Sequence, residues 1–335
     1  MERIQGLKEY TRSRKYREAV GIPEDAEVNY ILLAQGEYNI NYYFTHPVNQ
    51  KKLLLRVNCG SQMHLDRQIE YEFGALKQLE SSGRTPKPVW ADGSKADLDH
   101  GIMVMEYLEG RPLDYRIDLE LAAECLADIH STVILHPEQL ISPQDPLRAI
   151  LEECETMFAV YEQSSLAAPD KSDQIRRMLN KAWAMVGRSG NRDDRYKCCI
   201  NTELNSTNFL INGKAAPNYL IDWEKPLYGM PAQDLGHFLA PTTTFWKTDV
   251  ILSEEAVQEF IRIYQQAVND RFPAEDLEED VAVFIPVTCM RGITWCAMAW
   301  VQYQQPDKLI FNQSTFDKLN NYLENNFLND IERRL

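Results

Sequence analysis

The segment CCINTELNSTNFLINGKAAPNYLIDWEKP, residues 198–226, contains two short apolar runs, FLI and NYLI, on either side of a turn. The turn opens with Asn212-Gly213, which is a typical β-hairpin signal. Pairing of the two runs places Asn208 beside Asp222 at the open end of the hairpin. A carboxylate next to an amide oxygen suits Mg²⁺, which takes a few hard oxygen ligands from a protein and others from phosphates. We therefore predict a metal site at these two residues.

A third polar residue, Glu203, lies five residues before Asn208, on the loop that enters the same end of the hairpin. Loops are rich in Asn and Glu, so each residue alone is a weak signal. The combined spacing is far more specific, because Glu-x4-Asn is followed by a hairpin and by Asp222-Trp223 at its return. We expect these side chains to meet at one end of the hairpin.

A helix is predicted over residues 66–80, DRQIEYEFGALKQLE, from the spacing of its apolar residues. At about 100° per residue, Glu72 falls inside the apolar arc that contains Ile69 and Phe73. A buried carboxylate is costly unless it is paired, and the nearest candidate cation is Arg56 in the preceding apolar strand. We expect these two residues to pair; the alternative is that Glu72 reaches solvent at the edge of the lobe.

The arrangement of strands and helices predicts an α+β fold with two lobes. Turn signals divide residues 28–58 into three strands, and residues 101–107 form another short strand. Beyond a hinge near 106–112 the pattern is mostly helical, interrupted by the one hairpin. The expected division is a small β-rich lobe at 1–106 and a larger, mainly helical lobe at 107–335.

Taken in order, these motifs resemble those of the aminoglycoside phosphotransferase and choline kinase family of small-molecule kinases, over nearly the whole chain. That family has a phosphate loop, a strand cation, a helix glutamate, an Asp-x4-Asn catalytic loop and an Ile-Asp-Trp-type motif. The matching pieces are Gln35-Gly36-Glu37-Tyr38-Asn39, Arg56, Glu72, Glu203 with Asn208, and Ile221-Asp222-Trp223-Glu224. The hinge, the helix before the catalytic loop and the segment after the metal motif resemble Met103–Tyr107, Leu126–His130 and Gln233-Asp234-Leu235-Gly236.

The resemblance implies a protein-kinase-like two-lobed fold and a Mg²⁺-dependent phosphotransferase that uses ATP or GTP on a small hydroxylated acceptor. Phosphoryl transfer depends on positioning and on neutralising charge. By resemblance, Arg56 would hold the α- and β-phosphates and be oriented by Glu72. Asn208 and Asp222 would ligate Mg²⁺.

The resemblance also assigns roles to five further residues. The loop at Gly36 and Asn39 would cover the phosphates with backbone N–H groups, and Glu106 would lie in the hinge that receives the nucleotide base. Glu203 would orient the acceptor hydroxyl as the catalytic base, and Asp234 would brace the catalytic loop.

Three residues depart from the family pattern. Arg56 stands where many relatives have Lys. Arginine keeps the positive charge and adds a planar guanidinium group that can donate two parallel hydrogen bonds. Asn201 stands where the family usually has an architectural His, and Glu203 replaces the usual Asp. Because Glu is one CH₂ group longer than Asp, its carboxylate is displaced from the usual position. A displacement of about 1 Å of a catalytic group can reduce a reaction rate on the order of 10²-fold. Two interpretations follow: an active kinase with Glu203 as base, which the intact Asn208 and Asp222 favour, or a pseudokinase-like nucleotide-binding regulator.

The acceptor side of the site has three candidate residues. Arg291 is the only charged residue between Val281 and Tyr303, and it is either a wall of the acceptor pocket with Trp295 and Trp246 or a buried partner of a core carboxylate. We expect two histidines, His237 and His130, to have structural roles.

The formal net charge of −15 argues against nucleic acid as a partner, because phosphate backbones attract Lys and Arg clusters. Residues 1–106 carry 14 Lys and Arg against 15 Asp and Glu, a net of −1, which leaves −14 for residues 107–335. An acidic C-terminal lobe favours a cationic acceptor by electrostatic steering. The simpler interpretation is a solvated acidic surface.

The N-terminal twenty residues carry charges of both signs and no apolar run, which argues against a signal peptide. The seven cysteines lack Cys-x-x-Cys spacing, so we expect reduced thiols rather than disulfides or a zinc site. Residues 281–303 are interrupted by Pro, Arg and Gly, which favours buried core helices over a membrane span. These features predict a cytoplasmic protein.

Overall fold

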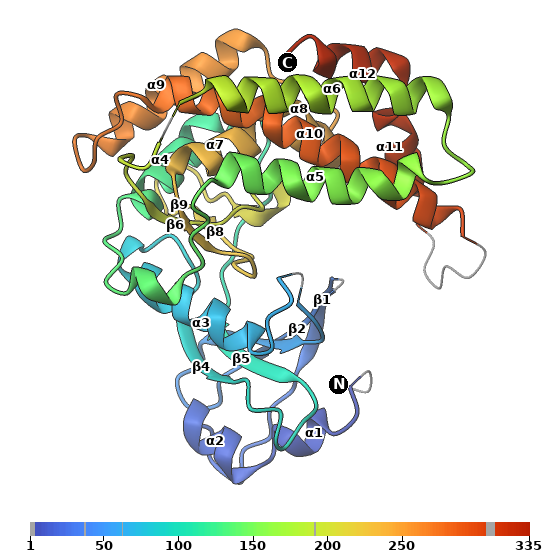
Figure 1. Ribbon diagram of the computed structural model, residues 1–335. Coiled ribbons are helices and arrows are strands. Elements are labelled where there is room, and N and C mark those ends of the chain that lie inside the picture. Colours follow the sequence, from blue (N-terminus) through green and yellow to red (C-terminus); the bar gives the residue numbers. More distant parts are fainter. Residues whose placement is uncertain (1–3, 37, 62, 191, 306–311) are drawn as a thin grey trace.

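Two lobes follow one another along the chain in the computed structural model (Figure 1). The structure describes residues 4–36, 38–61, 63–190, 192–305 and 312–335. We call the part through the five-stranded sheet the N-lobe and the helical remainder the C-lobe. The predicted α+β fold, with a small β-rich lobe followed by a larger, mainly helical lobe, is confirmed.

The N-lobe is built on one antiparallel sheet with strand order β1-β2-β3-β5-β4. Its strands are β1 (Ile31–Gln35), β2 (Asn39–Thr45), β3 (Lys52–Asn58), β4 (Pro88–Asp92) and β5 (Gly101–Glu106). Its helices are α1 (Leu7–Tyr10), α2 (Arg14–Val20) and α3 (Gln68–Leu79), followed by the 3-10 turn Glu80–Ser82.

Both faces of this sheet are covered, because successive side chains of a strand point to opposite faces. On β5, Ile102 and Val104 belong to a core cluster that also contains residues of α1 and α2. Met103 and Met105, which alternate with them, belong instead to the core that contains α3 and the C-lobe helices. Helix α3 thus shares its core with the C-lobe, which couples the two lobes through one buried cluster.

The C-lobe is mainly helical. Its helices are α4 (Leu119–His130), α5 (Pro146–Glu162), α6 (Pro169–Arg188), α7 (Pro231–Leu239), α8 (Pro241–Lys247), α9 (Glu254–Val268), α10 (Leu277–Tyr303), α11 (Gln313–Tyr322) and α12 (Asn325–Glu332), with 3-10 turns at Pro137–Gln139 and Ser206–Asn208. Two small antiparallel pairs complete it: β6 (Cys198–Ile200) with β9 (Leu227–Gly229), and β7 (Phe209–Leu210) with β8 (Tyr219–Leu220).

Helix α10 runs through the C-lobe and packs against α5, α7 and α8 (Figure 1). Two glycines allow the close approach: a Cβ at Gly236 would lie 2.4 Å from the Cβ of Phe284, and a Cβ at Gly292 would lie 2.6 Å from the Cβ of Thr242. Among the described residues, α10 is the one helix long and apolar enough to cross a membrane, and most of its apolar stretch is buried inside the protein. This agrees with the prediction of core helices, although one continuous helix forms, with Pro286 inside it.

The sequence underestimated the number of strands. The predicted hairpin is present as β7 and β8, but the C-lobe also contains β6 and β9, and the N-lobe contains β4. The β6–β9 pair has only three residues in each strand, which is too short for a periodic pattern. All seven cysteines are free, as expected.

Candidate active site

The β7–β8 hairpin brings Asn208 and Asp222 together at its open end. The backbone N–H of Ile221 donates to the carbonyl of Asn208 at 2.9 Å. The side-chain amide of Asn208 donates to the backbone carbonyl of Glu203 at 2.9 Å, so Oδ1 is the atom that this side chain can offer to a metal ion. Asp222 has a φ of +65°, in the left-handed region that Asp and Asn tolerate better than most residues.

Arg56 connects the N-lobe sheet to the hairpin end. One guanidinium nitrogen donates to buried Glu72, another lies 3.3 Å from Asp222 Oδ1, and the Nε donates to Asn41 at 3.1 Å. The side chains of Arg56 and Glu72 are 8% and 1% exposed, so the pair is desolvated. The structure therefore brings the two residues together as expected and adds Asp222 as a third partner.

Negative charge exceeds positive charge around Arg56. Three carboxylates, those of Glu72, Asp222 and Glu224, influence one another beside this one guanidinium. Burial and the Asp222 carboxylate raise the pKa of Glu224 to about 7, and burial raises the pKa of Glu72. One oxygen of Glu72 is buried and accepts no hydrogen bond from the described residues. A divalent cation would compensate this excess.

The donor set fits Mg²⁺ better than a transition metal. Asn208 and Asp222 offer an amide and a carboxylate oxygen, which are hard ligands. Among the described residues no group of three or more His, Cys, Asp and Glu side chains forms a closed metal cage. A Mg²⁺ ion held here would take its remaining oxygens from phosphates and water.

Gly36 and Asn39 lie at the turn between β1 and β2. The N–H of Gly36 donates to the carbonyl of Asn39 at 2.9 Å, so this N–H closes the turn. The Asn39 side chain is buried, donates to the Glu224 carboxylate and accepts from Asn58 at 3.0 Å. The side chain of Asn39 thus ties the turn to the C-lobe, a role that the sequence did not suggest. Glu37 and its part of the loop lie outside the described residues.

Glu106 ends β5, and its N–H donates to the carbonyl of Lys87 at 2.9 Å. The next residue, Tyr107, packs its ring against Tyr43 with centroids 5.6 Å apart. Two aromatic rings, one from β2 and one from the residue after β5, therefore lie together beside the predicted hinge.

The loop that carries Glu203 is braced by buried Asp234 on α7. Its two oxygens accept the backbone N–H groups of Asn201 and Thr202 at 2.8 and 2.7 Å. His130 lies 3.2 Å from the same carboxylate through Nε2 and 2.7 Å from the hydroxyl of Tyr264 through Nδ1. This buried network thus fixes the backbone of the two residues that precede Glu203.

Asn201 links this loop to the metal motif. Its side-chain amide donates to the carbonyl of Asp222 at 2.9 Å, and its Oδ1 accepts from the N–H of Glu203 at 3.1 Å. An asparagine supplies both a donor and an acceptor here. Asn201 therefore orders the loop through one donated and one accepted hydrogen bond.

The Glu203 carboxylate lies in a group of alternating charges that we call the acceptor-side cluster, formed by Glu203, Arg291, Glu153 and Lys225. Arg291 on α10 lies 3.2 Å from Glu203 Oε1 and 3.0 Å from Glu153 Oε2, and Lys225 lies 3.7 Å from Glu203. Burial raises the pKa of Glu203, but the Arg291 and Lys225 charges outweigh it and lower the pKa to about 2. The carboxylate is therefore ionised at neutral pH.

Three further side chains of interest belong to α10 and to α7 and α8, the two helices that pack against it here. Trp295 is one helical turn beyond Arg291 and 37% exposed, and its ring contacts Trp246 edge-on with centroids 5.3 Å apart. His237 interacts electrostatically with Glu203 and Arg291, and burial lowers its pKa to about 4, so the ring is neutral at pH 7. Arg291 is a partner of carboxylates, as one of its two interpretations expected, whereas its role as a wall of an acceptor pocket stays a prediction.

The sequence left three residues of the site without a role: Glu224, Lys225 and Glu153. The first two directly follow Asp222-Trp223, and their charges within an otherwise apolar motif are a usable signal. Glu153 lies on α5 among other acidic residues, so no pattern distinguishes it. Only the packing of α5 against α10 brings it to Arg291.

One family model and several solved structures match the chain. No curated protein matches the chain. Solved structures with a similar fold include a spectinomycin phosphotransferase bound to ADP and spectinomycin, with a TM-score of 0.65, 14% identity and 99% of both chains covered. A choline kinase from Cryptosporidium parvum has a TM-score of 0.66 and 13% identity, with 98% of this chain and 94% of that chain covered. An ethanolamine kinase from Plasmodium vivax has a TM-score of 0.64 and 14% identity, with 96% of this chain and 89% of that chain covered.

At these identities the structural likeness shows the fold alone. The family follows from the sequence, since the model of the phosphotransferase enzyme family matches residues 30–276, which include β1 to β5, the Glu203 loop, the hairpin and α7. The predicted relationship to aminoglycoside phosphotransferases and choline kinases is therefore confirmed. The chain belongs to the phosphotransferase enzyme family.

Proposed function

We propose that this protein is a Mg²⁺-dependent kinase that transfers the γ-phosphate of ATP or GTP to a hydroxyl group of a small acceptor. The observation that carries the proposal is the convergence of Asn208, Asp222 and Glu203 at one end of the β7–β8 hairpin, with Arg56 reaching it from the N-lobe. Membership of the phosphotransferase enzyme family supports the same activity.

In this proposal the nucleotide lies between the lobes. Residues 1–106 would supply the nucleotide-binding lobe, with the base beside Glu106 and the phosphates under the turn at Gly36 and Asn39. Nothing in the fold requires a glycine at 36, since a Cβ there would meet only the carbonyl of Asn39 at 3.8 Å. A close approach of phosphate to the backbone is a reason for glycine at such a position.

Arg56 would bind the α- and β-phosphates, with Glu72 fixing the orientation of its guanidinium. Asn208 and Asp222 would hold Mg²⁺. The Glu224 carboxylate interacts electrostatically with Asp222, so its charge would strengthen the attraction of this site for a cation. The bound ion would neutralise charge on the phosphate oxygens.

Glu203 would accept a hydrogen bond from the acceptor hydroxyl and take up its proton as the phosphoryl group is transferred. Its low pKa makes it a weak base, which suits a loose transition state in which orientation matters more than proton removal. The ion pairs with Arg291 and Lys225 would orient the Glu203 side chain, which is longer than that of Asp. The Asp234 network fixes the backbone just before Glu203.

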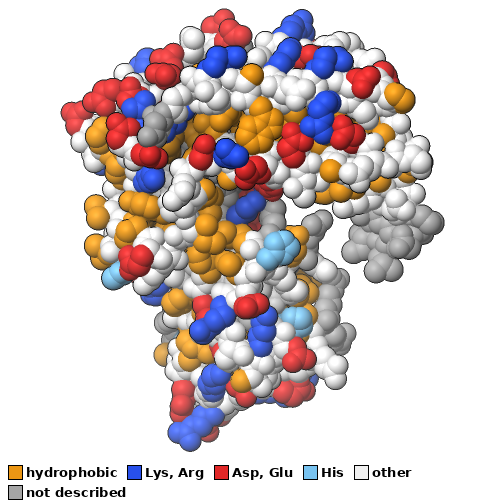
Figure 2. Space-filling model, in the orientation of Figure 1, with side chains coloured by type: hydrophobic (Ala, Val, Ile, Leu, Met, Phe, Trp, Pro, Cys, Tyr) orange, Lys and Arg blue, Asp and Glu red, His pale blue; other side chains and the backbone are white. Residues whose placement is uncertain are grey.

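The acceptor would bind on the far side of Glu203, against Trp246, Trp295 and Arg291. The acceptor-side cluster holds two carboxylates and two cations, so the excess negative charge of the C-lobe is not concentrated there. On the face seen in Figure 2, acidic side chains are interspersed with Lys and Arg over the C-lobe. A cationic acceptor is supported mainly by Glu153, whose side chain is 40% exposed.

Calorimetric titration with Mg²⁺-ATP and Mg²⁺-GTP tests the nucleotide site. We expect the wild type to bind at least one of them and Asp222→Asn to bind it much more weakly in the presence of Mg²⁺. Asn tolerates the positive φ at this position, so the substitution removes charge without straining the backbone. Equal binding by both proteins, or no binding by the wild type, would rule out the proposed metal site.

Turnover separates the kinase from the alternative of a nucleotide-binding regulator. Aminoglycosides, amino alcohols, sugars and hydroxy amino acids are incubated with Mg²⁺-nucleotide, and release of nucleoside diphosphate is measured. Nucleotide binding without turnover on any acceptor class would favour the regulator.

A further inference from the structure

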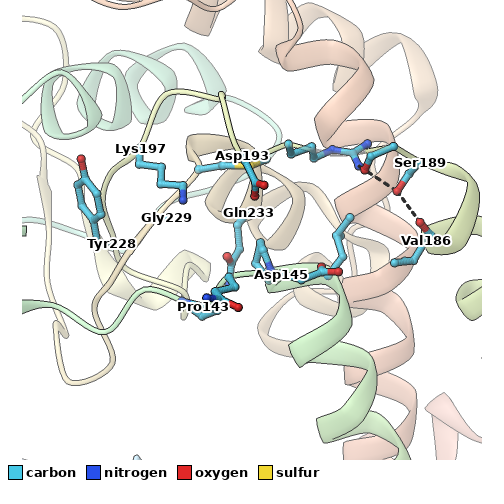
Figure 3. Close-up of a pocket in the computed structure, with 15 residues that line it drawn as sticks. Pro143, Asp145, Val186, Ser189, Asp193, Lys197, Tyr228, Gly229 and Gln233 are labelled. Carbon is cyan, nitrogen blue, oxygen red and sulfur yellow. Dashed lines mark hydrogen bonds between the residues drawn. The ribbon is translucent and has the colours of Figure 1, made fainter. Parts of the chain in front are cut away.

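A cavity of about 400 Å³ lies between the starts of α5 and α7, the end of α6 and strand β9 (Figure 3). Its volume falls in the range of about 300–1,000 Å³ typical of ligand pockets. None of its lining residues belongs to the proposed nucleotide, metal or acceptor sites. Its floor is buried and includes Gly229 and Met230, whereas its mouth carries the exposed residues Asp145 and Asp193.

The side chain of Gln233 enters this cavity (Figure 3). The residue is 8% exposed, and its Oε1 atom is shielded from solvent and accepts no hydrogen bond from the described residues. A Cβ placed on Gly229 would lie 3.6 Å from this oxygen. Buried acceptors are almost always paired in native proteins, so the amide points to a missing donor.

Lys197 directs its amino group toward the same space (Figure 3). Within the part of the chain that the structure describes, no carboxylate lies within 4.0 Å of this amine. The neighbouring cation Arg192 is already paired with Asp280 at 2.6 Å. Lys197 is therefore the cation that remains for an anionic ligand.

We propose that this cavity binds an α-amino acid in its zwitterionic form. The ligand carboxylate would pair with Lys197, and its ammonium group would donate to Gln233 Oε1. An amino acid carries this anion and this donor on one carbon atom. The carboxylates of Asp145 and Asp193 at the mouth favour an ammonium donor over a neutral hydroxyl.

Thermal unfolding in the presence of each of the twenty amino acids tests the proposal. The matched probes are amino acid amides, which lack the carboxylate, and α-hydroxy acids, which lack the ammonium group. We expect at least one amino acid to raise the Tm of the wild type, and neither matched probe to do so. Since no nucleotide is present, the result does not depend on the proposed kinase activity.

Two variants locate the binding. Lys197→Met and Gln233→Met each remove one polar group at similar volume, and each should weaken the affinity by about 10-fold or more. Lys51→Met, which removes an exposed lysine of the N-lobe, should bind as the wild type does. Without ligand, Gln233→Met should be at least as stable as the wild type, because it removes an unpaired buried acceptor.

Three results would overturn the proposal. They are the absence of any Tm shift with the amino acids, an equal shift in Lys197→Met and the wild type, and equal binding of the α-hydroxy acids.

Discussion

Two arginine–glutamate pairs flank the proposed reaction site, and they differ in their exposure. Arg56 and Glu72 are 8% and 1% exposed, whereas Arg291 and Glu203 are 18% and 27% exposed. The first pair lies between a strand and a helix of the N-lobe. The second joins a loop to α10 and shares its charges with Lys225 and Glu153.

We infer from this difference that the Arg56–Glu72 pair has a fixed, structural role, whereas the Arg291–Glu203 pair can take part in the proposed reaction. A desolvated pair holds one geometry because either partner alone would be a buried charge. A partly exposed cluster has alternative partners for each charge, so a substrate can enter it at lower cost. The structure thus combines a fixed pair at Arg56, the proposed phosphate-binding cation, with an adaptable cluster around Glu203 on the proposed acceptor side.

The largest expected effect is on stability. Arg56→Met leaves Glu72 buried without its cation, and we expect a loss of about 3–5 kcal/mol in the free energy of unfolding. Arg291→Met is the matched comparison and should cost less, about 2 kcal/mol, because Arg291 is the main cause of the lowered pKa of Glu203 but Glu203 keeps Lys225 and solvent. Urea denaturation of both variants measures the difference. Equal losses would remove the distinction between the two pairs.

A smaller effect concerns the length of the side chain at 203. Glu203→Asp restores the residue usual in the family but withdraws the carboxylate from Arg291. We expect the turnover rate to fall on the order of 10²-fold with the Tm nearly unchanged. Steady-state kinetics measures this, and a rate equal to or above that of the wild type would show that the Arg291 contact does not position Glu203.

The pH dependence of stability provides a third comparison. The pKa of Glu203 falls from an ordinary 4.5 to about 2 on folding, so its charge stabilises the folded state above pH 4.5. That contribution is lost as the pH falls from about 4.5 toward 2. The stability difference between the wild type and Glu203→Gln should therefore shrink over this interval in denaturation measurements. A constant difference would contradict the lowered pKa.

The smallest effect is expected at Trp295. Trp295→Ala removes a partly exposed wall of the proposed acceptor pocket, so the KM for the acceptor should rise by a factor of about 3–10 with little change in kcat. Nucleotide affinity should not change. A fall in kcat alone would place Trp295 outside the acceptor pocket.

The sequence predicted the parts of the site that depend on local patterns. The helical spacing around Glu72 indicated a buried carboxylate, and the hairpin signal brought Asn208 to Asp222. Both need only the geometry of one or two neighbouring elements. The two lobes followed from the change of hydrophobic period along the chain.

The remaining parts depend on contacts between distant elements. Arg291 lies 88 residues from Glu203 and 138 from Glu153, and only the packing of α10 against α5 and the loop brings them together. The role of Asn39 was missed because its partner Glu224 lies in the other lobe. Such contacts leave no periodic signal in a single sequence.

Release of nucleoside diphosphate by the wild type and by Glu203→Gln, each with Mg²⁺-nucleotide and the acceptor panel, tests the central claim most directly. We expect the wild type to turn over at least one acceptor and Glu203→Gln to be slower on the order of 10²–10⁴-fold, with unchanged nucleotide affinity. Equal release by both proteins would contradict the assignment of Glu203 as the catalytic carboxylate.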